Sequence, residues 1–114
     1  MDLATVETFE EDKFVTNFLT RGKVYGVWLG GKTCTHDKCL TGEKSVWVWE
    51  PTRNYINKAD RYNNWSKSGP KGLTQPDNFT TREACLAVLN NWYNDGVSWH
   101  DLECDDHLPF VCEN

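Results

Sequence analysis

The sequence predicts a small α+β domain held together by disulfide bonds. Three observations support this fold class: one amphipathic helix near the amino terminus, several short β-strand patterns separated by turn formers, and five cysteines in 114 residues. A chain of this length forms one domain, which we place at residues 1–114, and it buries roughly two-thirds of its unfolded surface. Six Trp, five Phe and four Tyr supply large side chains for its core.

A helix is predicted at about residues 8–21. Thr8 with Glu11 three residues later forms a capping box, and acidic residues fill the first turn, where the helix dipole favours negative charge. An apolar stripe follows, formed by Phe14, Val15, Phe18 and Leu19. Gly22 suits the position just past the helix end. We expect this helix to be structural.

Five short stretches have the pattern of β-strands. They span residues 24–29, 45–49, 83–89, 97–102 and 110–112. The first should end at the Gly30-Gly31 pair, and Pro51 should stop the second. Residues 52–74 are polar and rich in turn formers, and loops of this length in a compact domain are usually functional or disordered.

Cys34 and Cys39 enclose a short, turn-rich segment between Gly31 and Gly42. A Cys34–Cys39 disulfide that closes a surface turn is the favoured interpretation. The alternative is a zinc site formed by these cysteines and His36, but three ligands leave the tetrahedral set open and no obvious fourth ligand lies nearby.

Oxygen-bearing side chains recur towards the carboxyl end. Residues 75–114 hold eight Asp or Glu against the single Arg82, and such a surface repels itself unless it is spread out or neutralised by a cation. Ca²⁺ takes about six to eight oxygen ligands, more than one loop supplies. We predict a Ca²⁺ site formed by Gln75, Asp77, Glu83 and Asp101.

These four residues can converge only if the fold brings residue 77 beside residue 101. A Cys85–Cys104 disulfide would help to hold the two segments together. By closing a loop of about 20 residues, it would restrict the unfolded chain by roughly 3 kcal/mol.

The same stretch resembles the C-type lectin domain. Gln75-Pro76-Asp77 is similar to the family's Glu/Gln-Pro-Asn/Asp motif, and Trp99-His100-Asp101 to its Trp-Asn-Asp motif. Upstream, Val27-Trp28-Leu29-Gly30-Gly31 resembles the Trp-Ile-Gly-Leu signature, and residues 104–113 resemble the family's closing segment. The resemblance covers nearly the whole chain. It implies a C-type lectin-like fold with small antiparallel sheets, a flanking helix and a long loop region, here residues 52–82, that carries the ligand-site motif.

The resemblance also implies a sugar. In this family Gln-Pro-Asp is associated with galactose-type ligands, so galactose or N-acetylgalactosamine is expected. An aromatic ring at Phe79 could stack on the apolar face of the sugar, and the Gln75–Pro76 peptide should be cis. The implied carbohydrate-binding set is Gln75, Asp77, Phe79, Glu83, His100 and Asp101.

His100 departs from the family pattern, which has Asn at this position. An imidazole nitrogen is a poor ligand for hard Ca²⁺. Three alternatives stay open: His100 hydrogen-bonds the sugar, the Ca²⁺ site is weakened or lost, or the metal is softer, such as zinc. If His100 titrates at the site, binding should fall below about pH 6.5.

Cys112 is the cysteine left without a partner, and three alternatives stay open: a free thiol, a bond to another chain, or a partner lost by truncation. In the family the last strand pairs with a first strand, and its cysteine bonds one in a first helix. We expect both elements to be missing from this sequence, through truncation or through a real absence. In the second case an exposed strand edge would invite dimerisation.

Composition narrows the class of protein further. A net charge of −5 argues against a general nucleic-acid binder, and no apolar run is long enough to span a membrane. Five cysteines suggest an oxidising compartment, so we expect a secreted protein, although no signal peptide is visible. We expect no catalytic role, since adjacent Asp105 and Asp106 on a strand would point to opposite faces.

Two sites match the N-glycosylation pattern, at Asn64 and Asn78. The second lies in the predicted pocket, so we expect it to be unoccupied.

The function expected from the sequence is Ca²⁺-dependent binding of galactose-type glycans in innate immune or cell-surface recognition, strengthened by homo-oligomers. The alternative is a lectin-like domain that binds a protein, ice or mineral surface without a sugar.

Overall fold

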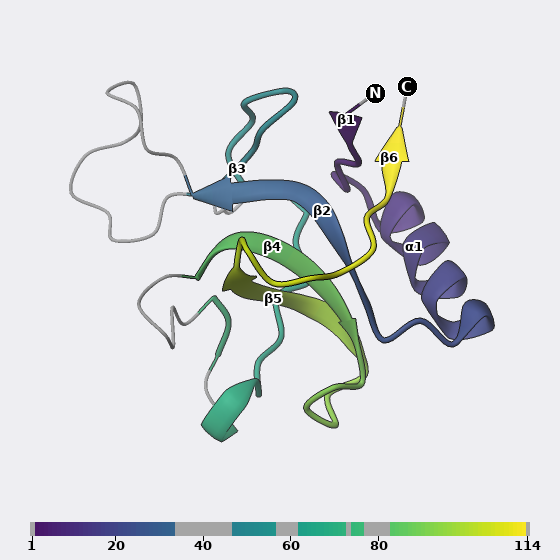
Figure 1. Ribbon diagram of the computed structural model, residues 1–114. Coiled ribbons are helices and arrows are strands. Elements are labelled where there is room, and N and C mark those ends of the chain that lie inside the picture. Colours follow the sequence, from purple (N-terminus) through teal and green to yellow (C-terminus); the bar gives the residue numbers. More distant parts are fainter. Residues whose placement is uncertain (1, 34–46, 57–61, 73, 77–82, 114) are drawn as a thin grey trace.

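The computed structural model describes residues 2–33, 47–56, 62–72, 74–76 and 83–113, and its architecture is α+β, as predicted (Figure 1). Helix α1 (Phe9–Gly22) lies beside a four-stranded antiparallel sheet of order β3-β2-β4-β5, and β1 pairs with β6 in a second sheet. The strands are β1 (Asp2–Leu3), β2 (Gly26–Thr33), β3 (Trp47–Trp49), β4 (Glu83–Asn90), β5 (Val97–Glu103) and β6 (Cys112–Glu113), with a short 3₁₀ helix η1 (Pro70–Gly72).

The start of α1 follows the predicted capping box. The backbone N–H of Glu11 donates to Thr8 Oγ1 at 3.2 Å, and Glu11 Oε1 accepts from the backbone N–H of Glu7 at 3.1 Å. The end differs from the prediction, because Gly22 is the last helical residue. Lys23 takes the left-handed cap conformation, with φ of 54°, and its N–H donates to Leu19 O.

The buried face of α1 is not the predicted stripe. Val15 and Leu19 are buried as expected, but Phe14 and Phe18 are 72% and 52% exposed. The third residue that the helix buries is the acidic Asp12. Its spacing with Val15 and Leu19 places all three on one helical face.

Asp12 joins α1 to segments far along the chain. Its carboxylate accepts hydrogen bonds from Tyr62 Oη at 2.6 Å, Asn64 Nδ2 at 3.0 Å and Trp99 Nε1 at 3.1 Å. Burial, followed by the hydrogen bond to Asp12 and its charge, raises the pKa of Tyr62 well above its ordinary value. One buried carboxylate therefore fixes the helix, the segment 62–66 and β5 relative to one another.

Strand β2 does not end at the glycine pair, as we had predicted, but continues to Thr33. The glycines permit this because each lies against other parts of the chain. A Cβ on Gly31 would lie 2.8 Å from Leu86 Cδ1, and one on Gly30 would lie 3.0 Å from Leu3 O. The pair thus lets β2 pass close to both β4 and the amino-terminal segment.

The prediction that the last strand lacks a strand partner is wrong. Strand β1 pairs with β6, with Leu3 opposite Cys112, and the two ends of the chain lie side by side in Figure 1. The reason is the extended amino-terminal segment: Ala4 N donates to Val111 O at 2.7 Å, while Ala4 O accepts from Gly30 N at 2.8 Å. This segment lies between β6 and β2. Cys112 itself is a free, half-buried thiol.

Tryptophans form the centre of the core. Trp47, Trp49 and Trp99 are at most 1% exposed. Trp99 packs edge-to-face on Trp49 at 5.5 Å and on Trp65 at 5.9 Å between ring centroids. These contacts hold segment 62–66 against β5, because Trp65 also forms a parallel bridge with Trp99.

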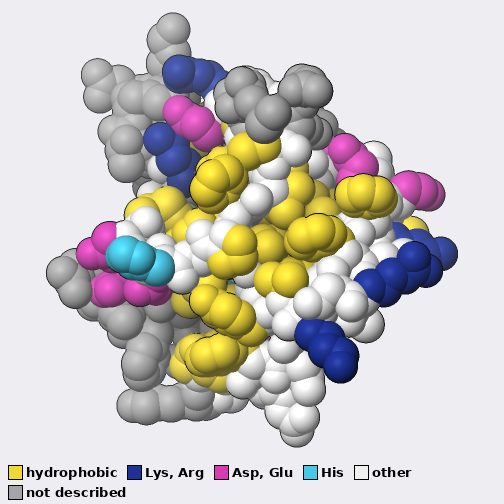
Figure 2. Space-filling model, turned by 45° about the vertical axis from the view of Figure 1, so that its right-hand side comes forward, with side chains coloured by type: hydrophobic (Ala, Val, Ile, Leu, Met, Phe, Trp, Pro, Cys, Tyr) yellow, Lys and Arg dark blue, Asp and Glu magenta, His cyan; other side chains and the backbone are white. Residues whose placement is uncertain are grey.

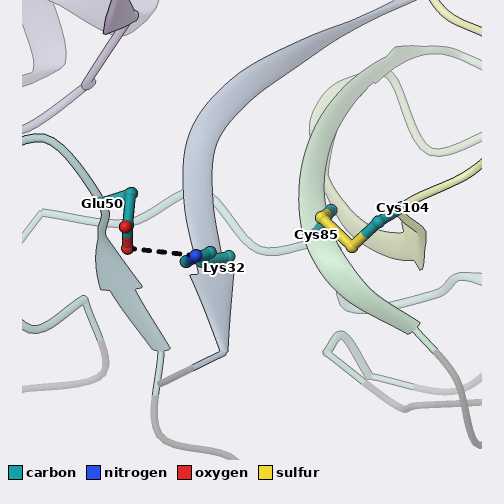
Figure 3. The surroundings of a disulfide bond; sticks show 4 residues. All are labelled: Lys32, Glu50, Cys85 and Cys104. Carbon is teal, nitrogen blue, oxygen red and sulfur yellow. Dashed lines mark ion pairs between the residues drawn. A yellow bond between two sulfur atoms is a disulfide. The ribbon is translucent and has the colours of Figure 1, made fainter. Parts of the chain in front are cut away.

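The predicted Cys85–Cys104 disulfide is present, with its Cα atoms 5.1 Å apart. It joins β4 to the segment that follows β5 (Figure 3). In the same view, Nζ of Lys32 on β2 lies 3.4 Å from Oε2 of Glu50, the residue that follows β3. Both side chains of this ion pair are nearly half exposed, so the pair adds little stability.

Candidate functional site

The six residues predicted to bind a sugar or metal fall into two groups. The structure describes the side chains of Gln75, His100 and Asp101, which are 4%, 1% and 2% exposed. The side chains of Asp77, Phe79 and Glu83 lie outside the described residues, although the backbone of Glu83 begins β4. The structure therefore gives the relative positions of Gln75, in the loop, and of His100 and Asp101, on β5.

The fold brings Gln75 next to β5. Gln75 N donates to Ser66 O at 2.7 Å, and Ser66 N donates to Trp99 O at 2.9 Å. Ser66 thus lies between the two segments and bonds to both. The predicted convergence of Gln75 with Asp77, Glu83 and Asp101 stays a prediction, because the side chains of Asp77 and Glu83 lie outside the described residues.

The Gln75–Pro76 peptide is cis, as predicted. The Gln75 amide packs directly on Gly69, because a Cβ added there would lie 2.8 Å from Gln75 Cδ. Gly69 is therefore needed for the observed position of the amide, and any larger residue would push it away.

His100 belongs to a buried polar network around Asp95. Asp95 Oδ2 accepts hydrogen bonds from Ser66 Oγ at 2.5 Å and Ser98 Oγ at 3.0 Å, and it lies 2.8 Å from His100 Nε2. The Asp95 and His100 side chains are only 3% and 1% exposed. Tyr93 covers the imidazole, with ring centroids 5.2 Å apart. The network joins the loop residue Ser66 to β5.

The carboxylate of Asp95 stays ionised despite its burial. Burial alone would raise the pKa of Asp95. Hydrogen bonds from Ser66 and Ser98 lower it, and His100 lowers it further through its charge and its own hydrogen bond, so the pKa of Asp95 lies below its ordinary value. Its second oxygen, Oδ1, is buried without a hydrogen-bond partner among the described residues.

This Ser, His and Asp combination is not a nucleophile–base relay. Such a relay needs the hydroxyl and the carboxylate on different ring nitrogens. Here Ser98 Oγ, at 3.4 Å, and Asp95 Oδ2 both approach His100 Nε2. The network therefore fixes the position of side chains and offers no activated nucleophile.

His100 and Asp101 lie on opposite faces of β5. The register pairs His100 with Ala87 and Asp101 with Leu86, and successive side chains of a strand alternate. Asp101 shares its face with Trp99, while His100 shares the other face with Ser98. The two residues of the predicted site are thus adjacent in sequence but separated by the strand.

Sequence reasoning missed Asp95 and Ser66. Asp95 stands between Asn94 and Gly96, which signal a turn, so it had the pattern of an ordinary exposed turn acid. The available signal was its place just before Ser98 and His100, whose spacing of two puts both on one strand face.

The donor set proposed for Ca²⁺ contains only oxygen ligands, which suits a hard cation. The Gln75 amide and the Asp101 carboxylate are almost fully buried, so an ion held by both would lose most of its water. A different acidic cluster is found at the end of β5: carboxylate oxygens of the half-buried Glu103 and the exposed Asp105 and Asp106 lie within 4.8 Å of one another.

Other predicted features can be placed in part. Cys34, His36, Cys39 and Asn78 lie outside the described residues. Asn64 Nδ2, the atom that a glycan would modify, donates to Asp12 Oδ2 at 3.0 Å and to Val97 O at 3.2 Å. A glycan would replace one of the two Nδ2 hydrogens and so remove at least one of these bonds, so we expect Asn64 to be unmodified in the folded domain. In the described part of the chain, no helix is both long and apolar enough to cross a membrane.

The chain is similar to a known protein family and to a solved structure. The family model described as Lectin C-type domain matches residues 2–114. Among solved structures, the C-type lectin CEL-I from Cucumaria echinata is similar, with a TM-score of 0.65 at 17% sequence identity. The match covers 96% of this chain and 64% of that chain, so this chain spans less than two-thirds of that lectin. At this identity the likeness shows the fold alone.

Proposed function

We propose that this chain, which belongs to the C-type lectin domain family, binds galactose-type glycans in a Ca²⁺-dependent manner. Gln75-Pro76-Asp77 carries the choice of galactose or N-acetylgalactosamine. The observation that best supports the proposal is the position of Gln75. Through Ser66, it is bonded beside β5, the strand that carries Asp101.

In this proposal Gln75, Asp77, Glu83 and Asp101 would hold the ion. When bound, Ca²⁺ supplies a positive charge that the vicinal hydroxyls of a sugar can share. The chain's own groups provide the directional contacts: carboxylates accept hydrogen bonds from hydroxyls, whereas the Gln75 amide both donates and accepts. This mixed set distinguishes one arrangement of hydroxyls from another.

Phe79 and His100 complete the proposed carbohydrate-binding set, Phe79 by stacking on the sugar ring. In the described structure the His100 ring lies 2.8 Å from Asp95 and is buried. It can contact a sugar only if it leaves this carboxylate. We therefore expect His100 to contribute less to sugar binding than the other residues of the proposed set.

Retention on immobilised galactose tests the proposal. The protein should be retained in the presence of Ca²⁺, released by EDTA, and retained again when excess Ca²⁺ is added. Free galactose should elute it, while free mannose at the same concentration should not. Retention that ignores EDTA, or no retention at all, contradicts the proposal.

Gly69→Ala should weaken this retention because the new Cβ displaces the Gln75 amide. We expect at least a fivefold loss of galactose affinity in calorimetry, with a loss of stability of about 1–3 kcal/mol. Lys67→Ala, at an exposed position in the same segment, should change neither quantity. Unchanged affinity in folded Gly69→Ala would remove Gln75 from the proposed site.

The setting of this activity is proposed as extracellular. A shallow sugar site binds one sugar weakly, so homo-oligomers would raise the avidity for glycans on microbes or cells. The proposed role is therefore innate immune or cell-surface recognition by a secreted protein.

A second candidate is recognition of a protein, ice or mineral surface without a sugar. One observation favours it: Gln75 and His100 are both almost fully buried, and His100 is bonded to Asp95. Indifference to both galactose and EDTA in the retention experiment would support this candidate.

A further inference from the structure

A surface cavity of about 310 Å³ lies outside the residues assigned to the galactose site. Its walls include Tyr25, Trp92, Tyr93, Asp106, His107 and Leu108. They come from three places: the residue before β2, the turn between β4 and β5, and the segment after β5. The proposed Ca²⁺ site uses none of them.

Two aromatic side chains at this cavity are exposed to solvent. Tyr25 is 49% exposed and Trp92 is 59% exposed, with their ring centroids 5.8 Å apart and tilted by 44°. The backbone behind them is fixed, because Asn90 N donates to Tyr25 O at 2.9 Å. The two rings therefore present apolar surface to solvent from a fixed backbone. Such a surface suits the apolar face of a small ring-shaped ligand.

The charge beside these rings is negative. Asp106 lines the cavity, and its carboxylate belongs to the cluster with Glu103 and Asp105. Among the described residues lining the cavity, the basic side chain is the imidazole of His107, and none is Lys or Arg. On the face shown in Figure 2, acidic side chains gather with a histidine at one edge of a broad hydrophobic area. Three close carboxylates repel one another and attract a cation.

Aromatic rings and carboxylates favour the same kind of ligand here. The face of a Trp or Tyr ring attracts a cation within about 6 Å. A neutral sugar would gain the ring contact alone, whereas an ammonium group also relieves the repulsion among the acids. The ligand should therefore combine an apolar ring face with one positive charge.

We propose that this cavity binds an amino sugar in its ammonium form, with the sugar ring on Trp92 and the ammonium group beside Asp106. A volume of about 310 Å³ is at the lower end of ligand pockets and fits a single sugar unit. The inference rests on the proposed function in one respect: the choice of a sugar as the ring that carries the ammonium group. It requires no metal.

Tyr93 connects this cavity to the buried network around Asp95. It lines the cavity, and its ring also contacts His100, which lies 2.8 Å from Asp95.

Calorimetry with galactosamine in EDTA, at about pH 6.5 where such an amine is charged, tests the proposal. EDTA removes any contribution from the Ca²⁺ site. Galactosamine should bind, while galactose and N-acetylgalactosamine, which carry no charge, should bind at least fivefold more weakly. Trp92→Ala and Asp106→Asn should each weaken galactosamine binding at least fivefold.

Two matched controls lie far from the cavity. Phe14→Ala removes another exposed aromatic ring and Glu10→Gln another exposed acid, and neither should change galactosamine binding. Absence of binding in EDTA, equal binding of galactose, or equal binding of tetramethylammonium would each overturn the proposal. Retention on galactose with Ca²⁺ is measured separately, so either site can fail without the other.

Discussion

Replacing Asp12 by alanine is expected to lower the free energy of unfolding by about 4 kcal/mol, measured by urea denaturation. The Asp12 side chain is 4% exposed and accepts hydrogen bonds from Tyr62, Asn64 and Trp99. Alanine would remove the acceptor of one buried donor, Trp99 Nε1, and of two part-buried donors, Tyr62 Oη and Asn64 Nδ2. Because small domains have a stability of about 5–15 kcal/mol, this single change removes a large share of it.

Two further variants make the result interpretable. Glu10→Ala removes an exposed acid from the same helical turn and should cost less than about 1 kcal/mol. Asp12→Asn keeps the shape and one acceptor oxygen, so it should fall between the two and remain measurable if Asp12→Ala does not fold. A loss below about 1 kcal/mol for Asp12→Ala would show that these three bonds do not anchor the helix.

The position of Asp12 also matters for the proposed lectin site. It holds Tyr62 and Asn64, which lie in the same segment as Ser66, and Ser66 bonds to Gln75. Helix α1 therefore supports the loop that carries Gln75, although the helix lies outside the site itself.

Features decided by short stretches of sequence were predictable. The capping box at Thr8 and Glu11 depends on residues three apart, so its pattern indicates the start of α1. Strands β4 and β5 followed their alternation to within one residue. The fold and the cis Gln75–Pro76 peptide came from the resemblance to a family, since neither follows from local pattern alone.

Features decided by distant contacts were not predictable from local pattern. Phe14 belongs to the apolar stripe of α1 but is exposed, whereas Asp12 has the pattern of a solvent-facing acid in the first turn but is buried. Partners about 50 to 90 residues away determine which face of the helix packs inward. The pairing of β1 with β6 likewise joins the two ends of the chain.

For the candidate site, the sequence predicts a donor set whose arrangement the structure describes only in part. Gln75 lies next to β5 through Ser66, whereas Asp77, whose approach to Asp101 the oxygen-ligand argument required, lies outside the described residues. His100, however, contacts Asp95, and strand alternation separates it from Asp101. The motif alone could not show this, because the acid that binds His100 lies in the preceding turn.

Asp95→Asn is expected to lower the free energy of unfolding by about 2–3 kcal/mol at pH 7. The ionised carboxylate accepts from Ser66 and Ser98 and lies against His100, and an amide would place a donor group among these donors. Asp105→Asn, which changes an exposed acid after β5, should stay within about 0.5 kcal/mol of the wild type. Urea denaturation at constant salt compares the three proteins.

The pH dependence separates the charge of Asp95 from its shape. The folded-state pKa of Asp95 lies below the unfolded value of about 3.9, so its stabilising effect is complete above that value and is lost as the pH falls through the folded pKa. Wild-type stability should therefore fall more steeply than that of Asp95→Asn between about pH 5 and pH 2. His100 is the titratable group that faces this carboxylate, and Asp95→Asn leaves it in place. Parallel curves for the two proteins would mean that the ionised form of Asp95 does not stabilise the fold.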